Sequence, residues 1–428
     1  MMRSSVWLVG LLACRGGSEA KPDASPDSVA IDAPVDAPGC GAAQPVTVEG
    51  PALPPGSTVT LDLTVVSHDA NGAVCNRATA SGSEASITID TPPSGMITMI
   101  VNSSAAPRVQ RLTWTLVQPG EHLLYPSFVI RGATNRTLPV SLSIAALTGA
   151  TSYDLTVMCE RAGTSNMQVT PGTIAVDVTC IGSAQHVTAR VRANVGSATS
   201  FAVGDVVPIA STGTTTIPMG AWMNASLLTA TIHGGSAFDQ DVIGAAFAPT
   251  PGGFGTGSSF RFAPGGDPVT IGPVEVPGQW GGISFVALDS SMMPRHALEL
   301  AQAYTTPSAY DLTVGTSFLP PIDATLDAAF PRAEVTWHPQ SAMADTDLVI
   351  IKVTDWTIIA PGHPGKLRYP ALPVDLMPTA TTSLIGVCTK DSIDIAGYDA
   401  ARLDPFAIVT ANNFRGSCFG DPIAGDFF

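Results

Sequence analysis

The sequence predicts an all-β protein in which tandem β-sandwich modules follow a disordered acidic tether. Short runs rich in Thr, Val and Ile are bounded by Gly, Pro, Asn or Asp; Thr58–Val66, for example, is followed by the turn dipeptide Asn71-Gly72. The chain of 428 residues contains 41 Gly and 36 Pro, a composition that disfavours long helices and suits strands joined by tight turns. Several such strands in each hundred residues are typical of β-sandwiches.

The composition also excludes some classes of protein. Hydrophobic residues make up 45% of the chain and charged residues 13%, which is too apolar and too weakly charged for a chain disordered throughout. The net charge of −15 leaves no basic patch to neutralise phosphates, so nucleic acid is not an expected partner.

The N-terminal residues predict export. Arg3 supplies a positive charge, Val6–Leu12 forms a short apolar segment, and Ala13 provides a small residue before Cys14. This arrangement is typical of a secretory signal peptide over residues 1–13. An ordinary cleaved signal with an incidental cysteine is the alternative.

The sequence Leu11-Leu12-Ala13-Cys14 resembles the lipobox of Gram-negative bacterial lipoproteins. The resemblance implies that Cys14 is diacylated, becomes the mature N-terminus and anchors the protein in a membrane. In such lipoproteins a residue other than Asp after the cysteine, here Arg15, implies export to the outer membrane or cell surface. A periplasmic or secreted protein is the alternative.

The composition of residues 14–39, which follow the predicted signal peptide, predicts an extended tether. Aspartates recur among Pro and Ala at Asp23, Asp27, Asp32 and Asp36. Such a segment cannot bury a core, and its charges repel one another, so an extended spacer is expected. Similar Asp-Ala-Pro spacers follow the lipobox in the lipoproteins that this chain resembles.

The cysteines predict three disulfides. Apart from Cys14 there are six, an even number in an exported protein, and their clustering favours nearest-neighbour pairing. A structural zinc site would normally show closely spaced cysteine pairs, which this sequence lacks. The predicted pairs are Cys40 with Cys75, Cys159 with Cys180, and Cys388 with Cys418.

The length allows three or four domains. We expect β-sandwich modules at residues 40–135, 136–215 and 332–428, with a turn-rich β module at residues 216–331. Ser290–Tyr304 is ambiguous, because it has a helix-capping serine and good helix formers but also follows a strand pattern; we favour a strand.

Two internal repeats support the modular reading. Trp114–Gly120 matches Trp356–Gly362, and each is followed by a Leu-x-Tyr-Pro sequence; Tyr153–Val157 recurs as Tyr310–Val314. We interpret the longer repeat as one strand and corner used twice, with Trp filling the space between two sheets.

The C-terminal sequences Val335–Pro339, Trp356–Pro361 and Leu367–Pro373 are similar to those of uncharacterised bacterial lipoproteins with fibronectin type III-like or immunoglobulin-like modules. That resemblance covers about a hundred residues and implies no activity.

Candidate functional residues are few. The seven histidines include no pair at metal-ligand spacing, and no nucleophile elbow or phosphate loop is found. Calcium is the more reasonable ion for the loops of an acidic exported protein, and no other cofactor is expected. The weak calcium candidates are Asp239, Asp241, Asp345 and Asp347. Solvated turn residues are the alternative for all four.

Aromatic residues near the glycine-rich stretch could contact a ligand. Phe254 and Trp280 are the weak candidates for stacking on a sugar or a protein. Core positions are the alternative for aromatic residues of this region.

These observations favour an exported, lipid-anchored surface or periplasmic protein with a structural, adhesive or ligand-binding role and no evident catalytic motif. A protein or a glycan would be its ligand. The alternative is a carbohydrate-active or calcium-dependent hydrolase with its site in module 216–331, which would require carboxylates that converge in the folded chain.

Overall fold

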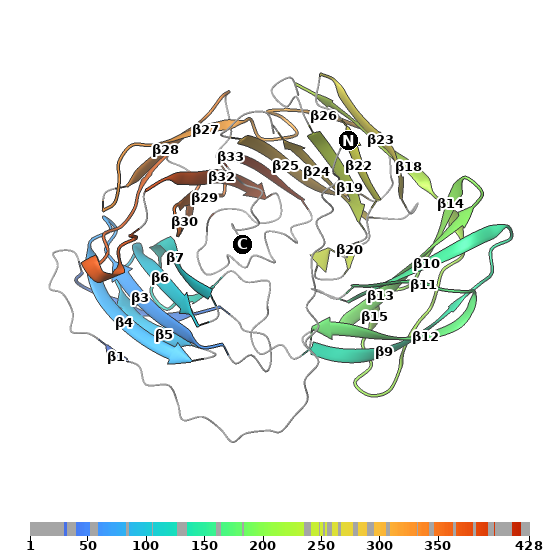
Figure 1. Ribbon diagram of the computed structural model, residues 1–428, viewed down its shortest axis with the longest axis horizontal. Coiled ribbons are helices and arrows are strands. Elements are labelled where there is room, and N and C mark those ends of the chain that lie inside the picture. Colours follow the sequence, from blue (N-terminus) through green and yellow to red (C-terminus); the bar gives the residue numbers. More distant parts are fainter. Residues whose placement is uncertain are drawn as a thin grey trace.

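The computed structural model describes the greater part of the chain (Figure 1). The described residues are 30–31, 40–51, 59–82, 85–104, 106–125, 135–159, 164–181, 184–234, 241–247, 249–250, 253–254, 259–263, 267–276, 281–288, 295–304, 309–331, 333–341, 346–362, 365–379, 382–392, 398 and 413–420.

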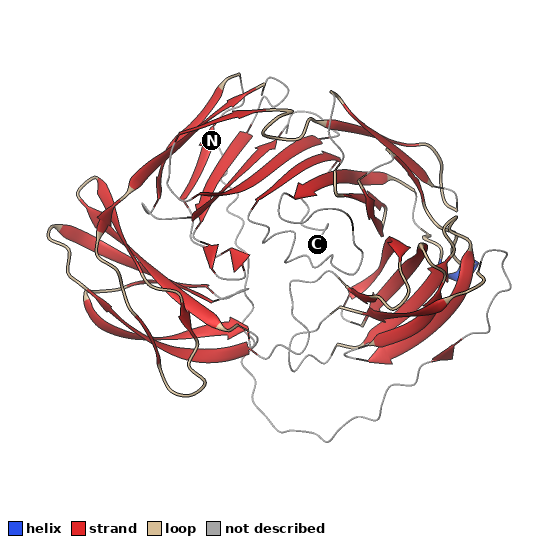
Figure 2. Ribbon diagram, turned by 180° about the vertical axis from the view of Figure 1, so that it is seen from behind, coloured by secondary structure: helices blue, strands red, loops and turns tan. Residues whose placement is uncertain are grey.

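The described chain is almost entirely β-structure, which confirms the predicted fold class (Figure 2). One 3₁₀ turn, η2 (Val374–Leu376), is the one helical element among these residues. The ambiguous segment is strand β25 (Arg295–Tyr304), as favoured from the sequence.

One sheet of thirteen strands runs through most of the molecule. In spatial order its strands are β1 (Ala30–Ile31), β4 (Val74–Gly82), β3 (Leu61–His68), β6 (Gly95–Ser103), β7 (Ala106–Val117), β30 (Trp356–Pro361), β29 (Leu348–Val353), β32 (Leu384–Ser392), β33 (Asn413–Gly420), β25, β24 (Gly281–Leu288), β19 (Asp241–Phe247) and β22 (Ser259–Ala263). Strands from three of the four predicted modules therefore share one hydrogen-bonded ladder.

Smaller sheets complete this part of the molecule. They are β5 (Ser86–Thr91), β2 (Gln44–Glu49) and β8 (His122–Leu124); β27 (Ile322–Leu326), β28 (Glu334–Pro339) and β31 (Lys366–Arg368); β23 (Val269–Val276), β18 (Ser226–His233) and β26 (Ala309–Thr313); and the pair β20 (Pro249–Thr250) and β21 (Gly253–Phe254). The predicted boundary between residues 331 and 332 falls within the β27–β28 pair.

A separate sandwich is formed by the chain between residues 135 and 224. One of its sheets contains β11 (Thr164–Gln168), β10 (Ala150–Cys159), β13 (His186–Val195), β14 (Ala198–Val203), β17 (Met223–Asn224) and β15 (Val207–Pro208). The other contains β12 (Gly172–Ile181), β9 (Asn135–Ile144) and β16 (Thr215–Ile217). Apolar side chains that alternate along β9, β10 and β13 fill the core between them.

The predicted tether is described at one point. Ala30 and Ile31 form β1, which pairs with Thr79 and Ala78 at the edge of β4. This pairing departs from the expected free spacer. It has a simple cause, because an apolar dipeptide within the acidic segment meets a strand edge with free backbone groups.

The three disulfides join the cysteines that the sequence pairs: Cys40–Cys75, Cys159–Cys180 and Cys388–Cys418. The second links the two sheets of the 135–224 sandwich, since Cys159 ends β10 and Cys180 lies in β12. The third joins directly opposed residues of β32 and β33. Each bond therefore fixes a contact within one structural unit.

The two copies of the longer repeat, Trp114–Gly120 and Trp356–Gly362, begin in strands that are neighbours in the large sheet. β7 and β30 are parallel neighbours, with Trp114 opposite Ile359 and Trp356 opposite Arg111. Both tryptophans are fully buried, as expected, but they lie on opposite faces of the sheet: Trp114 packs in the core under β2, and Trp356 packs in the core under β28.

Strand β29 is consequently covered on both faces. Leu348 and Ile350 contact the core beneath β2, whereas Val349 and Ile351 contact the core beneath β28. A strand buried on both faces reads as a continuous apolar run, which matches Leu348–Val353.

A chain of buried hydrogen bonds crosses four adjacent strands at this junction. The Trp356 indole N–H donates to Thr113 Oγ1 (2.8 Å), and Thr113 Oγ1 and Thr98 Oγ1 are 2.8 Å apart. Thr98 Oγ1 in turn lies 2.9 Å from Nε2 of the buried His68. Because an unpaired buried polar group is costly, these hydrogen bonds fix the order and register of β3, β6, β7 and β30.

Polar contacts also fasten the loops beside the junction. Arg111 forms an ion pair with Asp355 and donates from Nε to the Leu376 carbonyl (3.0 Å). The Ala371 amide donates to the Gly72 carbonyl (2.8 Å). Gly72 has a φ of +81°, and a Cβ there would lie 2.9 Å from Pro370 Cα, so both the turn and the close approach require glycine.

Burial keeps His68 neutral. Desolvation lowers the pKa of His68 from 6.5 to about 3, although the Asp69 carboxylate and the Gly72 backbone oppose this effect. The unfolded chain therefore takes up a proton below pH 6.5 that the folded chain does not. The stability that His68 confers is complete above pH 6.5 and is lost as the pH falls toward 3.

We predict that His68→Gln reduces the acid sensitivity of folding. Between pH 6.5 and 4.5 the wild-type protein should lose about 2 to 3 kcal/mol of unfolding free energy through His68, and the variant should not lose this part. Denaturant unfolding of both proteins across this range measures the difference. Equal slopes for the two proteins would contradict the prediction, and an NMR titration of His68 checks the folded pKa independently.

We predict that the double variant Cys159→Ser and Cys180→Ser is destabilised by about 3 kcal/mol, because the cysteines are 21 residues apart and the bond restricts the unfolded chain. Thermal unfolding measures the loss. Mass spectrometry of the wild-type protein should find the six cysteines of the three disulfides oxidised, and free thiols at these positions would argue against the bonds.

Candidate functional site

The structure describes part of the set of residues that the sequence singles out. Outside the described residues lie Cys14, Asp239, Trp280 and Asp345. Asp241 begins β19 and Phe254 ends β21, and in both the structure describes the backbone alone. Asp347 precedes β29 and is half-buried, and its carbonyl accepts a hydrogen bond from the Gly362 amide (3.3 Å).

These positions do not converge on one place. β19 and β29 belong to the same sheet, but β32, β33, β25 and β24 lie between them, so Asp241 and Asp347 are distant from each other. Within the described part of the chain, no three His, Cys, Asp or Glu side chains are placed to hold a metal ion.

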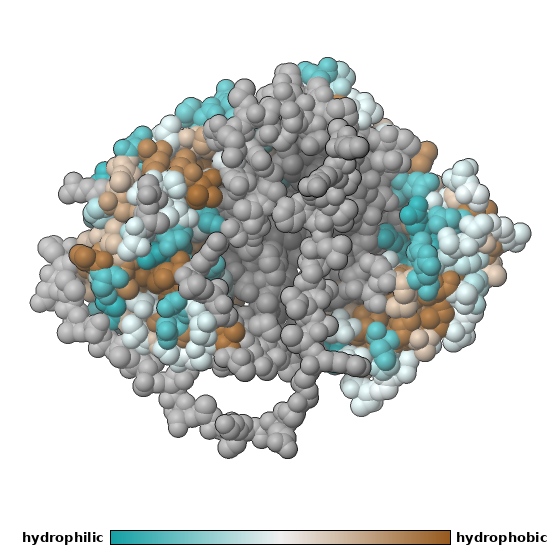
Figure 3. All heavy atoms as spheres, viewed as in Figure 1, coloured by the Kyte–Doolittle hydropathy of each residue, from teal (hydrophilic) through white to brown (hydrophobic). Residues whose placement is uncertain are grey.

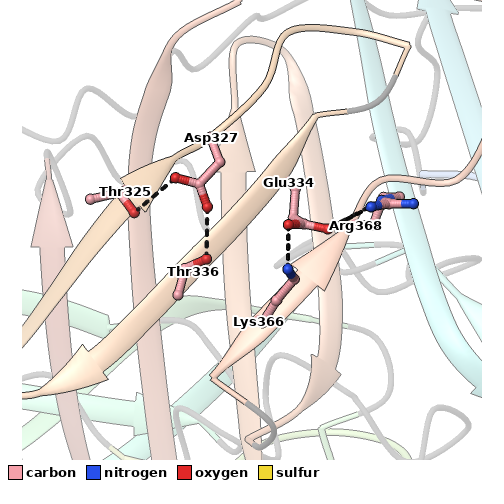
Figure 4. Close-up of polar contacts among 6 residues, drawn as sticks. All are labelled: Thr325, Asp327, Glu334, Thr336, Lys366 and Arg368. Atoms are coloured by element: carbon pink, nitrogen blue, oxygen red, sulfur yellow. Dashed lines mark hydrogen bonds and ion pairs between the residues drawn. The ribbon is translucent and has the colours of Figure 1, made fainter.

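A polar face covers the outer side of β27, β28 and β31 (Figure 4). Glu334 Oε1 lies 2.6 Å from Lys366 Nζ, and its Oε2 accepts hydrogen bonds from Arg368 Nη2 (2.9 Å) and Nε (3.2 Å). Asp327 accepts hydrogen bonds from Thr336 (2.9 Å) and Thr325 (3.4 Å).

The same pattern continues at the other end of β27. Asp323 accepts hydrogen bonds from Gln340 Nε2 at 3.3 and 3.2 Å, and Nε2 of His296 in β25 lies 3.2 Å from it. The carboxylates of this face are thus matched by donors from neighbouring strands. Such a face suits a hydrated surface better than the binding of a charged ligand.

Contact with cations favours the ionised form of Glu334. The hydrogen bond from Lys366 is the largest cause of the lowered pKa of Glu334; desolvation opposes it, and Arg368 adds to it.

Exposed apolar side chains are scattered. The large ones among the described residues are Leu116, Leu124, Leu227 and Val374. Figure 3 shows apolar residues interspersed with hydrophilic ones on the 135–224 sandwich and on the side of the molecule that carries β3 and β4. Single exposed side chains of this kind do not define a binding site.

The open edge of the 135–224 sandwich is a stronger candidate. Strand β12 pairs with β9 over ten residues without a register shift, and no other strand described in the structure pairs with it. In an antiparallel edge strand, every second residue directs its N–H and C=O groups away from the sheet. These groups are available to a further strand.

A shallow groove lies beside this edge. Its volume is about 480 Å³, and its lining consists of Gln168, Val169, Thr170, Thr173 and Ile174. Gln168 ends β11, Val169 and Thr170 lie in the connection that follows, and Thr173 and Ile174 lie at the start of β12. Val169 and Ile174 are the apolar residues of this lining, and both are half-buried against the core, as are Met167 and Val176 nearby.

Other sheet edges in the described chain carry protective features that β12 lacks. β31 is three residues long and contains Lys366 and Arg368, while β23 contains Pro273 and pairs through a register shift. β11, β22, β26 and β27 have five residues each, β5 has six, and the remaining terminal strands have two or three. β4, which β1 covers at two of its nine residues, carries Arg77. Short length, basic residues, proline and bulges all hinder the addition of a strand. β12 has ten residues, with no proline, lysine or arginine.

The sequence pattern of this strand does not indicate that its edge is open. The alternation of Ile174, Val176 and Val178 is visible in the sequence, whereas the absence of a second neighbour is a property of the tertiary structure. The one signal in the sequence that could have pointed to this site is the length of the strand pattern, ten residues with a single charged residue, Asp177.

The comparisons with known proteins add little. No protein-family model matches the chain, and no curated protein matches it. One solved structure with a weak likeness is a candidate adhesin from Bacteroides ovatus, at 7% sequence identity and a TM-score of 0.15 over 49% of this chain and 95% of that one. A TM-score this low does not establish a common fold.

No helix within the described residues is long and apolar enough to cross a membrane.

We predict that Glu334→Gln lowers the free energy of unfolding at neutral pH, and that the stabilities of the two proteins converge as the pH falls through the lowered folded pKa of Glu334. The stabilising effect of Glu334 requires its charge, so it is present above the unfolded pKa and is lost as the pH falls through the lowered folded pKa. Thermal unfolding from pH 3 to 7 measures this. Thr47→Val is the control. It removes a neutral contact between Thr47 and Thr88, which face each other on β2 and β5, away from Glu334, and it should show no such convergence.

Proposed function

We propose that this protein is an exported, lipid-anchored binding protein of the cell surface or periplasm, with an adhesive or ligand-binding role. The observation that supports it best is the ten-residue edge of β12, with a shallow groove at its start. Natural sheets rarely leave such an edge open unless a partner or another device covers it.

The compartment follows from the cysteines. Three disulfides are typical of proteins that fold outside the cytoplasm, because the cytoplasm keeps thiols reduced. The finer assignment to the outer membrane rests on the lipobox-like Leu11–Cys14, on Arg15 and on the acidic spacer.

A hydrolase in module 216–331 has no specific support. Such an enzyme would need titratable groups that converge in a cleft. β19, β22 and β24 of this module are described by their backbone alone, and the described side chains show no metal-binding cluster.

We predict that Cys14→Ser moves the protein from the membrane fraction to the soluble fraction, because the acylated residue is lost. Fractionation of cells that produce either protein, with labelling by radioactive palmitate, measures this. A wild-type protein that incorporates no label and remains soluble would show that Leu11–Cys14 belongs to an ordinary signal peptide.

The same soluble variant tests the binding role. Glycan arrays and intact cells should retain the folded protein but not the protein that has been reduced and alkylated. Retention of neither form would leave a purely structural role.

A further inference from the structure

We propose that the β12 edge binds an extended polypeptide segment of a partner protein, with apolar residues at alternate positions and a Lys or Arg beside Asp177. This inference rests on the proposed function, since it names the class of ligand for the same edge.

The backbone of β12 determines the class of ligand. Its free N–H and C=O groups alternate along ten residues in regular register with β9. An extended polypeptide presents complementary groups at the same repeat, whereas a glycan does not. The addition of a peptide strand to a sheet edge is an established mode of recognition.

The side chains determine the pattern of the ligand. Thr173, Ala175, Asp177 and Thr179 are exposed on the outer face of β12, while Ile174 and Val176 face the core and remain half-buried. An added strand would place every second side chain on the side of Ile174 and Val176, and one of them over the groove next to Val169 and Ile174. Those positions favour Val, Ile or Leu, and the alternate positions face water.

The charge selects the outward-facing residue. Asp177 is the one charged residue of β12, it is exposed, and Pro139 lies opposite it on β9, so the neighbouring strand supplies no cation. Opposite charges on facing strands are stabilising, which favours Lys or Arg in the ligand.

Charge also argues against a second copy of the chain as the occupant. Two copies would each carry a net charge of −15 and an Asp177 on the pairing strand. A basic or neutral peptide meets no such repulsion.

The test uses the full mature chain with Cys14→Ser and a fluorescein-labelled, end-capped octapeptide. Val alternates with Thr in this peptide, and one central Thr is replaced by Lys. Fluorescence anisotropy should show saturable binding. A matched peptide with Glu in place of Lys should bind more weakly by about threefold to tenfold.

A charge reversal supplies the matched protein variant. Asp177→Lys should reverse this preference, so that the Glu peptide binds more tightly than the Lys peptide. Asp90→Lys, at an exposed position of β5 on a different sheet, is the control and should leave the preference unchanged.

Peptide N-methylation tests the backbone. Methyl groups on one set of alternate amides should abolish binding, and those on the other set should have a much smaller effect, because an added strand turns every second amide toward β12. Hydrogen exchange should slow at alternate amides of residues 172–181 when the peptide binds.

The outcomes separate the inference from the proposed function. If neither set of N-methyl groups nor Asp177→Lys changes the affinity for the peptide, the inference is overturned. Sedimentation that shows a dimer with protected β12 amides in the absence of peptide assigns the edge to a second copy and also overturns it. Retention on glycans or cells without any peptide binding preserves the proposed binding role and rejects the peptide ligand.

Discussion

The parallel pairing of β7 with β30 is the contact on which the rest of the large sheet depends. It joins segments that are 243 residues apart at the hydrogen bond between Trp356 and Thr113. A parallel pair of such separation costs much chain entropy. The buried hydroxyls and the Arg111–Asp355 ion pair make the correct register specific, and two hydrophobic cores on opposite faces supply the stabilisation.

The sequence predicted the fold class well, because the relevant signals are local. Period-two alternation, turn residues and cysteine clustering all act over a few tens of residues. The pairing of β7 with β30 escaped prediction for a physical reason: alternation along a strand shows which side chains are buried but not which strand lies beside it. The repeated Trp sequences therefore suggested two equivalent modules, although the two strands are neighbours with their rings on opposite faces.

The candidate site shows the same limit. Sequence reasoning looked for chemistry in acidic loops and aromatic residues, such as Asp347 and Phe254, because loops usually carry function. The open edge of β12 carries no unusual residue type. Its character comes from the end of a sheet, the nearby end of β11 and an unmatched Asp177, and these features come together only in the folded chain.

The Cys40–Cys75 bond has a mechanical consequence. Cys40 is the point where the N-terminal segment enters the folded protein, and its partner lies in β4 of the large sheet. Tension applied through residues 14–39 would first peel the two residues of β1 from β4. It would then reach a covalent bond and pass into a strand that is hydrogen-bonded along its length to β3. An N-terminal segment attached in this way transmits force to β4, near the edge of the large sheet, and spares β2, the first long strand of the chain.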